Sequence, residues 1–120
     1  MKVKFLQTVL AGLAYLALGT PAFAHAFLDH AVPGVGTTVG TSPAELELTF
    51  TEDIVPAFSG VRVAGPSGAV AIGKPVFGPA NSLHVRLAHA LKPGTYAVSW
   101  HVVSVDTHHT QGTYRFTIAP

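Results

Sequence analysis

Short runs of alternating apolar and polar residues recur along this chain and determine its fold class. In residues 95–103 an apolar side chain stands at every second position, and the same alternation occupies residues 44–50, 82–87 and 113–118. A period of two places one face of a strand against a core and the other face toward solvent. No segment shows a sustained 3.6-residue period, so the pattern predicts strands and not helices.

Glycine, proline and serine separate these runs, which is typical of an antiparallel β protein. Shorter candidate strands lie at residues 60–64 and 69–72, whereas residues 65–81 as a whole are expected to form a long surface connection. About seven strands in one domain predict an all-β fold, a single immunoglobulin-like Greek-key β-sandwich or barrel. There is no cysteine to form a disulfide. Large apolar side chains must therefore hold the two sheets together, chief among them Phe50, Tyr96, Trp100 and Phe116.

Residues 1–24 have the features of a cleaved export signal. Lys2 and Lys4 precede an apolar run, and the segment closes with the small-residue pattern Ala-Phe-Ala at Ala24. A membrane anchor is the alternative, but this apolar run is shorter than the roughly 20 residues that span a bilayer. We therefore expect cleavage after Ala24, export to the periplasm and a mature domain of residues 25–120.

The composition of this mature domain excludes several classes of function. Two of the seven Lys and Arg residues leave with the signal, so five basic residues face six acidic ones. This balance gives no reason to expect nucleic acid or an anionic membrane as a partner. The absence of cysteine excludes thiolate metal sites and cysteine nucleophiles. All seven histidines lie in the mature part. Histidine is thus the unusual component, and a monomeric histidine-bearing domain is expected.

Two of these histidines follow the tryptophan-bearing strand in the sequence SVDTHHTQG, residues 104–112. If the strand continues past Trp100, alternation places Asp106 and His108 on the core side and His109 on the opposite side. A buried Asp and His are costly unless they are paired or bind a metal. Either the strand has already ended and these side chains lie at the rim of the sandwich, or they form a polar site there. By itself, Asp-x-His favours a hydrogen-bonded turn over a metal site.

The metal hypothesis gains weight from the position of His25. Cleavage after Ala24 makes His25 the amino terminus, so its amine and its imidazole can chelate a metal together, with the imidazole of His108 as a third nitrogen. Nitrogen and oxygen ligands suit Cu(II), with Asp106 or Glu52 supplying the oxygen. The one methionine is Met1, which leaves with the signal, so the mature chain has no thioether ligand for Cu(I).

Several motifs together resemble the CopC family of periplasmic copper-resistance proteins. They are HAF at the mature start, LTFTEDI at 48–54, FSGVRV at 58–63 and LKPGTYAVSWHVVSVDTHHTQGTYRFTI at 91–118. The resemblance covers essentially the whole mature chain. It implies a small Greek-key domain that binds Cu(II) at one end, through His25, Asp106 and His108, with Glu52 as an additional acidic residue near the metal. It also implies a possible partner, an inner-membrane copper-transport protein.

The sequence departs from part of the family in one respect. Some members carry a methionine-rich loop that binds Cu(I), whereas residues 65–81 here contain no methionine and no clustered histidine. This difference favours a member that binds Cu(II) alone.

Two other functions remain alternatives at this point. An amino-terminal histidine brace is also the active site of copper-dependent polysaccharide monooxygenases, so the ligand set alone is compatible with an oxidative enzyme. We expect a protein that is not an enzyme, because the chain lacks the common catalytic motifs and most of its aromatic residues lie in core phase. The second alternative is a structural adhesion domain in which Asp106 and His108 merely form a turn.

Overall fold

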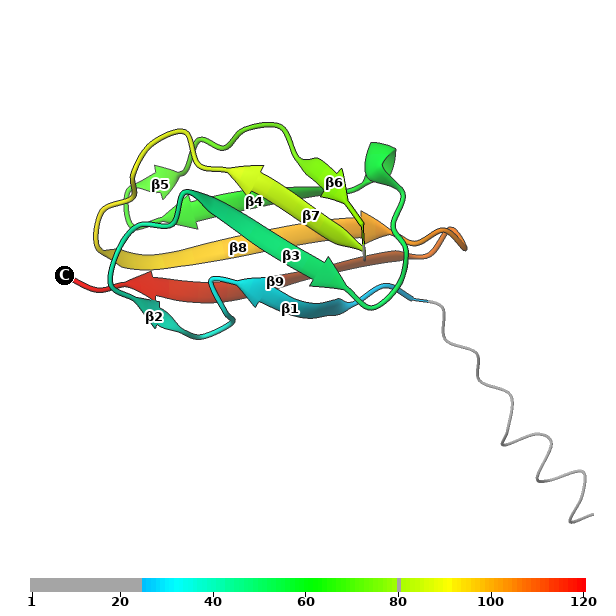
Figure 1. Cartoon of the computed structure of the whole chain (residues 1–120), viewed down its shortest axis with the longest axis horizontal. Coiled ribbons are helices and arrows are strands. Elements are labelled where there is room, and N and C mark those ends of the chain that lie inside the picture. Colours follow the sequence, from blue (N-terminus) through cyan, green and yellow to red (C-terminus); the bar gives the residue numbers. More distant parts are fainter. Residues whose placement is uncertain (1–24, 80) are drawn as a thin grey trace, which may run out of the picture.

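The computed structural model describes residues 25–79 and 81–120; the predicted signal peptide, residues 1–24, lies outside the described part. The described residues form two β-sheets packed face to face (Figure 1). Their strands are β1 (Leu28–Val32), β2 (Thr38–Val39), β3 (Glu45–Phe50), β4 (Gly60–Gly65), β5 (Gly68–Ala69), β6 (Val76–Gly78), β7 (Ser82–Arg86), β8 (Gly94–Val103) and β9 (His109–Ile118), with one 3₁₀ turn, η1 (Pro56–Phe58).

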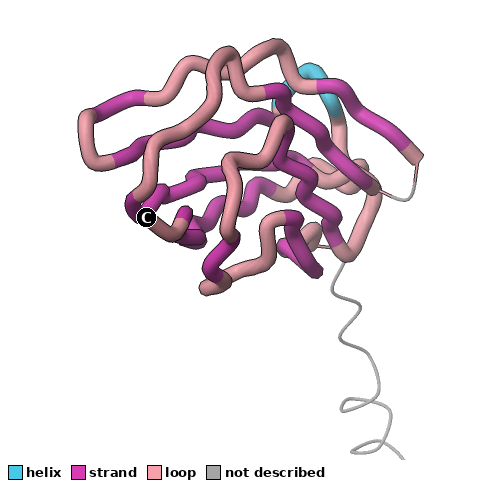
Figure 2. The backbone as a smooth tube through the Cα atoms, turned by 60° about the vertical axis from the view of Figure 1, so that its left-hand side comes forward, coloured by secondary structure: helices cyan, strands magenta, loops and turns pink. Residues whose placement is uncertain are grey.

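The chain crosses repeatedly between the two sheets. One sheet has the strand order β1-β3-β7-β6, and the other has the order β2-β9-β8-β4-β5. The connection from β3 to β4 passes through η1 at one end of the sandwich, and the same end holds the turn between β8 and β9 (Figure 1). Seen from the side, the two layers and the loops that join them enclose a single core (Figure 2). The predicted class, an all-β Greek-key sandwich, is confirmed.

The core is built from the apolar positions of the alternating runs. Phe50 and Trp100 meet edge to face with ring centroids 5.2 Å apart, and Tyr96 stacks on Phe116 at 5.7 Å. All four of these residues, predicted to hold the sheets together, are buried. The long antiparallel ladder between β8 and β9 runs from Gly94 opposite Ile118 to Val103 opposite His109. Because alternate residues of both strands face inward, this ladder supplies much of the core.

The number and placement of the shorter strands differ from the prediction. Nine strands occur in the described part of the chain, against about seven expected, and two of them have only two residues. β1 was not predicted, because its register shifts between Leu28 and His30 and interrupts the alternation. The expectation that residues 65–81 as a whole form a surface connection missed β6, and β5 overlaps the candidate strand 69–72 only at Ala69. Edge strands bury little surface, so their sequence pattern is weak.

Among the described residues, no helix is long and apolar enough to cross a membrane.

Candidate metal centre

The turn between β8 and β9 positions Asp106 and His108. β8 ends at Val103, and Ser104 then begins a tight reversal in which its N–H donates to the His108 carbonyl at 2.9 Å. Thr107 has a φ of 72°, the left-handed conformation that reverses the chain here. The condition under which Asp106 and His108 would face the core, a strand that continues past Val103, is therefore not met. The strand has ended, and these side chains lie at the rim of the sandwich.

The carboxylate of Asp106 is held from both sides. The buried hydroxyl of Ser104 donates a hydrogen bond to Oδ1, while Oδ2 lies 3.0 Å from Nδ1 of His108. The hydrogen bond from Ser104 is the main cause that lowers the pKa of Asp106 below its ordinary value, and the neighbouring His108 adds to it against a partial opposing effect of burial. With Nδ1 of His108 directed at a carboxylate, Nε2 is the ring nitrogen that remains available to a ligand.

A separate set of contacts fixes the chain around His25. Ala26 is fully buried, and its carbonyl accepts a hydrogen bond from the hydroxyl of Thr110 in β9. The N–H of Phe27 donates to Thr51 Oγ1 at 2.9 Å, and the N–H of Thr51 donates to the Phe27 carbonyl at 2.8 Å. These anchors clamp the residues after His25 between the end of β3 and the start of β9.

As a result, His25 lies against His108. The centroids of the two imidazoles are 4.2 Å apart, and their planes are inclined by 35°. His25 is also 6.1 Å from the ring of Phe27 by centroid distance. The side chain of His108 is half exposed, and that of Asp106 is less so. Two imidazoles and one carboxylate from opposite ends of the chain thus meet at one open edge of the sandwich.

Glu52 is less closely associated with this group. Its segment runs beside the β8–β9 turn, since Val105 donates its N–H to the Asp53 carbonyl at 3.2 Å and Ile54 forms a β-bridge with Ser104. The Glu52 side chain is exposed and makes no hydrogen bond or ion pair with the other three predicted ligands within the described residues.

Side chains alone do not complete a metal site here. In the part of the chain that the structure describes, no group of three or more His, Asp and Glu side chains is arranged to hold a metal ion. The structure brings the side chains of His25, Asp106 and His108 together. A metal bound at this edge would therefore need a donor besides these side chains.

Two other histidines have carboxylate partners of their own. His30 lies 3.0 Å from the carboxylate of Asp29, and His84 lies 3.8 Å from that of Glu45. Sequence reasoning did not assign roles to Ser104, Thr51 or Thr110. Ser104 had a signal, because it shares its alternation phase with Asp106 and His108, but Thr51 and Thr110 had none.

The fold and this group of side chains define a small all-β domain with imidazole and carboxylate groups gathered at one end. The chain belongs to the CopC family: the family model described as "CopC domain" matches residues 28–119. This is a family of copper-binding resistance proteins and not of enzymes, in agreement with the prediction from the sequence.

Three similar proteins illustrate the relationship. Protein YobA of Escherichia coli strain K12 is 41% identical over 106 residues, which cover 85% of this chain and 86% of that protein. The crystal structure of PcoC, a methionine-rich copper resistance protein from Escherichia coli, superposes with a TM-score of 0.73 at 32% identity, covering 79% of this chain and 99% of PcoC. The copper transport protein CutJ of Bacillus subtilis strain 168 is 29% identical over 99 residues, which cover 80% of this chain but only 18% of CutJ.

Proposed function

We propose that residues 25–120 form a periplasmic protein that serves copper homeostasis or resistance. It binds Cu(II) as its cargo at the edge of the sandwich where His25 and His108 meet. The observation that carries this proposal is the 4.2 Å approach of the His25 and His108 rings at an open edge of the sandwich. Membership of a copper-resistance family supports copper as the metal. Cleavage after Ala24 is part of the proposal, because it places a free amine on His25.

The donor set favours the oxidised ion. The amine and imidazole of His25, Nε2 of His108 and an oxygen of Asp106 give nitrogen and oxygen ligands, which suit tetragonal Cu(II). Cu(I) prefers thioether and thiolate ligands, and the mature chain has neither methionine nor cysteine. PcoC is described as methionine-rich, so this chain differs from that relative in the ligands it can offer to Cu(I).

Asp106 and Glu52 take different parts in this proposal. Asp106 already contacts Nδ1 of His108 at 3.0 Å, so it orients that imidazole whether or not it also reaches the metal. Glu52 lies on the neighbouring segment with an exposed carboxylate. It is proposed as an additional acidic residue near the ion, brought in when copper binds.

Delivery of copper to a transporter is the finer part of the proposal. CutJ is named a copper transport protein, and the region of it similar to this chain makes up only 18% of its length. A domain of this kind therefore occurs within a longer transport protein. We infer that this chain acts as the separate counterpart, passing Cu(II) to an inner-membrane copper-transport protein or retaining it when none is available.

A copper titration of the processed protein tests this function. Electron paramagnetic resonance should show one equivalent of tetragonal Cu(II) with nitrogen coupling, and a Cu(I) chelator with ascorbate should then remove the copper completely. Tight retention after reduction would contradict the assignment to Cu(II). Sustained peroxide production or polysaccharide cleavage with ascorbate would favour the alternative, an oxidative enzyme with a histidine brace.

A further inference from the structure

The two sheets of the sandwich differ in charge. The four-stranded sheet contains Asp29, Glu45 and Glu47, and the other three acidic residues lie in the loops at the His25 end. No strand of the five-stranded sheet contains an acidic residue, yet β4 carries Arg62 and β9 carries Arg115. Within the described residues, the ion pairs all involve histidine, and neither arginine has a carboxylate partner.

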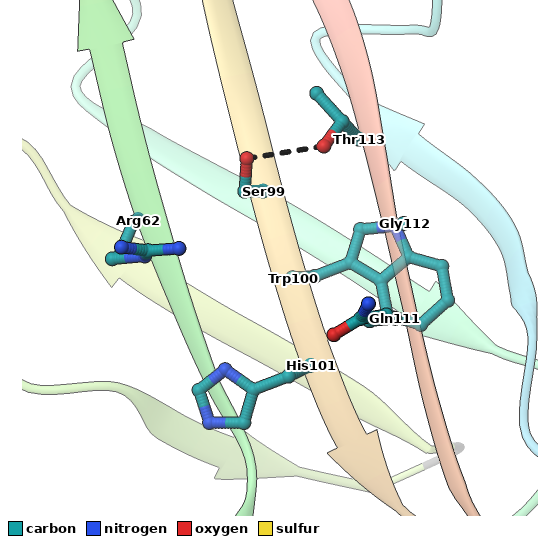
Figure 3. A pocket seen from close by; sticks show the side chains of 7 residues that line it. All are labelled: Arg62, Ser99, Trp100, His101, Gln111, Gly112 and Thr113. Atoms are coloured by element: carbon teal, nitrogen blue, oxygen red, sulfur yellow. Dashed lines mark hydrogen bonds between the residues drawn. The ribbon is translucent and has the colours of Figure 1, made fainter.

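A hollow of about 400 Å³ lies on the outer face of this acid-free sheet. Its lining residues come from the three central strands β4, β8 and β9 (Figure 3), and they are Arg62, Ser99, Trp100, His101, Gln111, Gly112 and Thr113. The register explains the grouping. Arg62 is opposite Ser99, which is opposite Thr113, and the next row places His101 opposite Gln111. Polar groups from three strands therefore share one small area.

One glycine helps to shape the hollow. A Cβ at Gly60 would lie 2.8 Å from Cε1 of His101, so this imidazole rests directly on the β4 backbone. A side chain at Gly60 would therefore displace the ring that borders the hollow. The indole of Trp100 is buried against Phe50, so it lies on the core side of the sheet and not in the hollow.

The lining presents hydrogen-bond donors without a competing carboxylate. Arg62 and Gln111 are exposed, and their guanidinium and amide groups bear N–H donors. The hydroxyls of Ser99 and Thr113 are 3.1 Å apart (Figure 3), so one donates to the other and the second proton remains available. The planar fork of an arginine matches the two oxygens of a carboxylate or phosphate and gains strength from its charge.

We propose that this hollow is a binding site for a small oxyanion, a carboxylate or phosphate group of a small molecule, held chiefly by Arg62 with His101, Gln111 and the Ser99–Thr113 pair around it. None of these residues is among the proposed copper ligands. The site is therefore expected to bind its anion in copper-free protein and to be unaffected by loss of His25 or His108.

Amide proton–nitrogen correlation spectra of the copper-free processed protein provide the test. Citrate and inorganic phosphate are titrated separately at constant ionic strength, set with sodium chloride. We expect saturable shifts confined to residues lining the hollow in at least one of the two titrations, and the anion that saturates at the lower concentration identifies the source. Absence of saturable shifts with both anions would overturn the proposal.

Two substitutions distinguish a site from a generally cationic face. Arg62→Gln should weaken the saturable binding at least tenfold. Arg115→Gln removes the same charge from the same face, two residues beyond Thr113 and outside the lining, so it should weaken the binding much less than Arg62→Gln does. Equal weakening by both substitutions would overturn the proposal, and the spectra themselves report whether each variant is folded.

Discussion

The end of the sandwich that carries Asp106 and the body formed by its strands differ in how they pair polar groups. At the end, the Ser104 hydroxyl, the Asp106 carboxylate and the His108 imidazole satisfy one another within five residues of sequence. In the body, Arg62 on the outer face has no carboxylate partner, and the buried Tyr114 hydroxyl has no hydrogen-bond partner in the described residues.

The two regions therefore differ in how their side chains are positioned before a ligand binds. At the end, the local network fixes the orientation of one imidazole, but the coordination of a metal must be completed by groups from the amino terminus, which is distant in sequence. On the strands, the backbone register sets the positions of side chains, and unpaired cations remain open to an anion. The following predictions test whether Cu(II) binding at the end depends on particular side chains. They also test whether substitutions in the strand body change only stability.

The largest effect is expected from the two neighbouring histidines. His108→Ala should reduce Cu(II) affinity by more than about 100-fold, because loss of a ligand should exceed the 10–100-fold cost of losing a group that orients one. His109→Ala is the matched control, since His109 starts β9 opposite Val103, whereas the ring of His108 is the one that lies against His25. Competition titration with a Cu(II) chelator measures both. Similar losses in the two variants would contradict the proposed geometry.

A somewhat smaller effect is expected at the orienting carboxylate. Asp106→Asn should weaken Cu(II) binding by about 10–100-fold, because it replaces the charged acceptor that holds Nδ1 of His108. Asp53→Asn offers a control of equal charge change on the adjacent exposed segment. If the two variants bind copper equally well, the local network at the end has no part in the site.

Two buried tyrosines in the strand body allow a comparison between a phenol hydroxyl with a hydrogen-bond partner and one without. The Tyr96 hydroxyl donates to the Lys92 carbonyl at 2.7 Å, whereas the Tyr114 hydroxyl is buried without a partner. Tyr96→Phe should lower the free energy of unfolding by about 1 kcal/mol, and Tyr114→Phe should leave it unchanged or raise it by up to about 1 kcal/mol. Urea unfolding measures both, and the opposite ranking would show that Tyr114 has a partner after all.

The same tyrosine predicts a dependence on alkaline pH. Burial raises the pKa of Tyr114 well above its ordinary value. Because the unfolded phenol ionises above pH ~10 while the folded one keeps its proton, the contribution to stability is present below that pH and is lost as pH rises. Tyr114→Phe should remove this component from the alkaline loss of stability. A stability profile unchanged by the substitution would argue against the buried phenol.

The smallest effect concerns the pKa of Asp106. Since the hydrogen bond from the Ser104 hydroxyl is the largest single cause of its lowered pKa, Ser104→Ala should raise the pKa of Asp106. A lowered pKa stabilises the fold above the ordinary value of about 3.9, and this contribution is lost as pH falls through the folded pKa. Side-chain carbon chemical shifts followed against pH give the values. An unchanged pKa of Asp106 in Ser104→Ala would contradict this role of the Ser104 hydroxyl.

Much of the fold could be predicted from the sequence, because strands that face the core alternate visibly. The run 44–50 encloses β3, and the pattern in residues 95–103 coincides with nearly all of β8. Edge strands escaped detection. β1 places Asp29 and His30 in exposed positions across a register shift, so its sequence does not alternate.

The candidate site divides in the same way. The proximity of Asp106 and His108 follows from two residues of separation and a turn, which the sequence could indicate. The approach of His25 depends on Thr51 and Thr110, which hold the amino-terminal segment from positions 24 and 84 residues away from their partners. Contacts at such separations leave no local pattern, so the pairing of His25 with His108 was predicted from the ligand chemistry of a cleaved amino terminus and from the family resemblance, and not from spacing.

The most direct test of the account compares Cu(II) binding by two forms of the domain, one beginning at His25 and one with a methionine before it. In the second form the nitrogen of His25 is a peptide amide without a basic lone pair, so the chelate ring between amine and imidazole cannot form. Circular dichroism should show the same fold for both. We predict that the methionine-preceded form binds Cu(II) at least about 100-fold more weakly and with an altered paramagnetic resonance spectrum. Equal affinity and identical spectra would show that the amine of His25 is not a ligand and would contradict the proposed site.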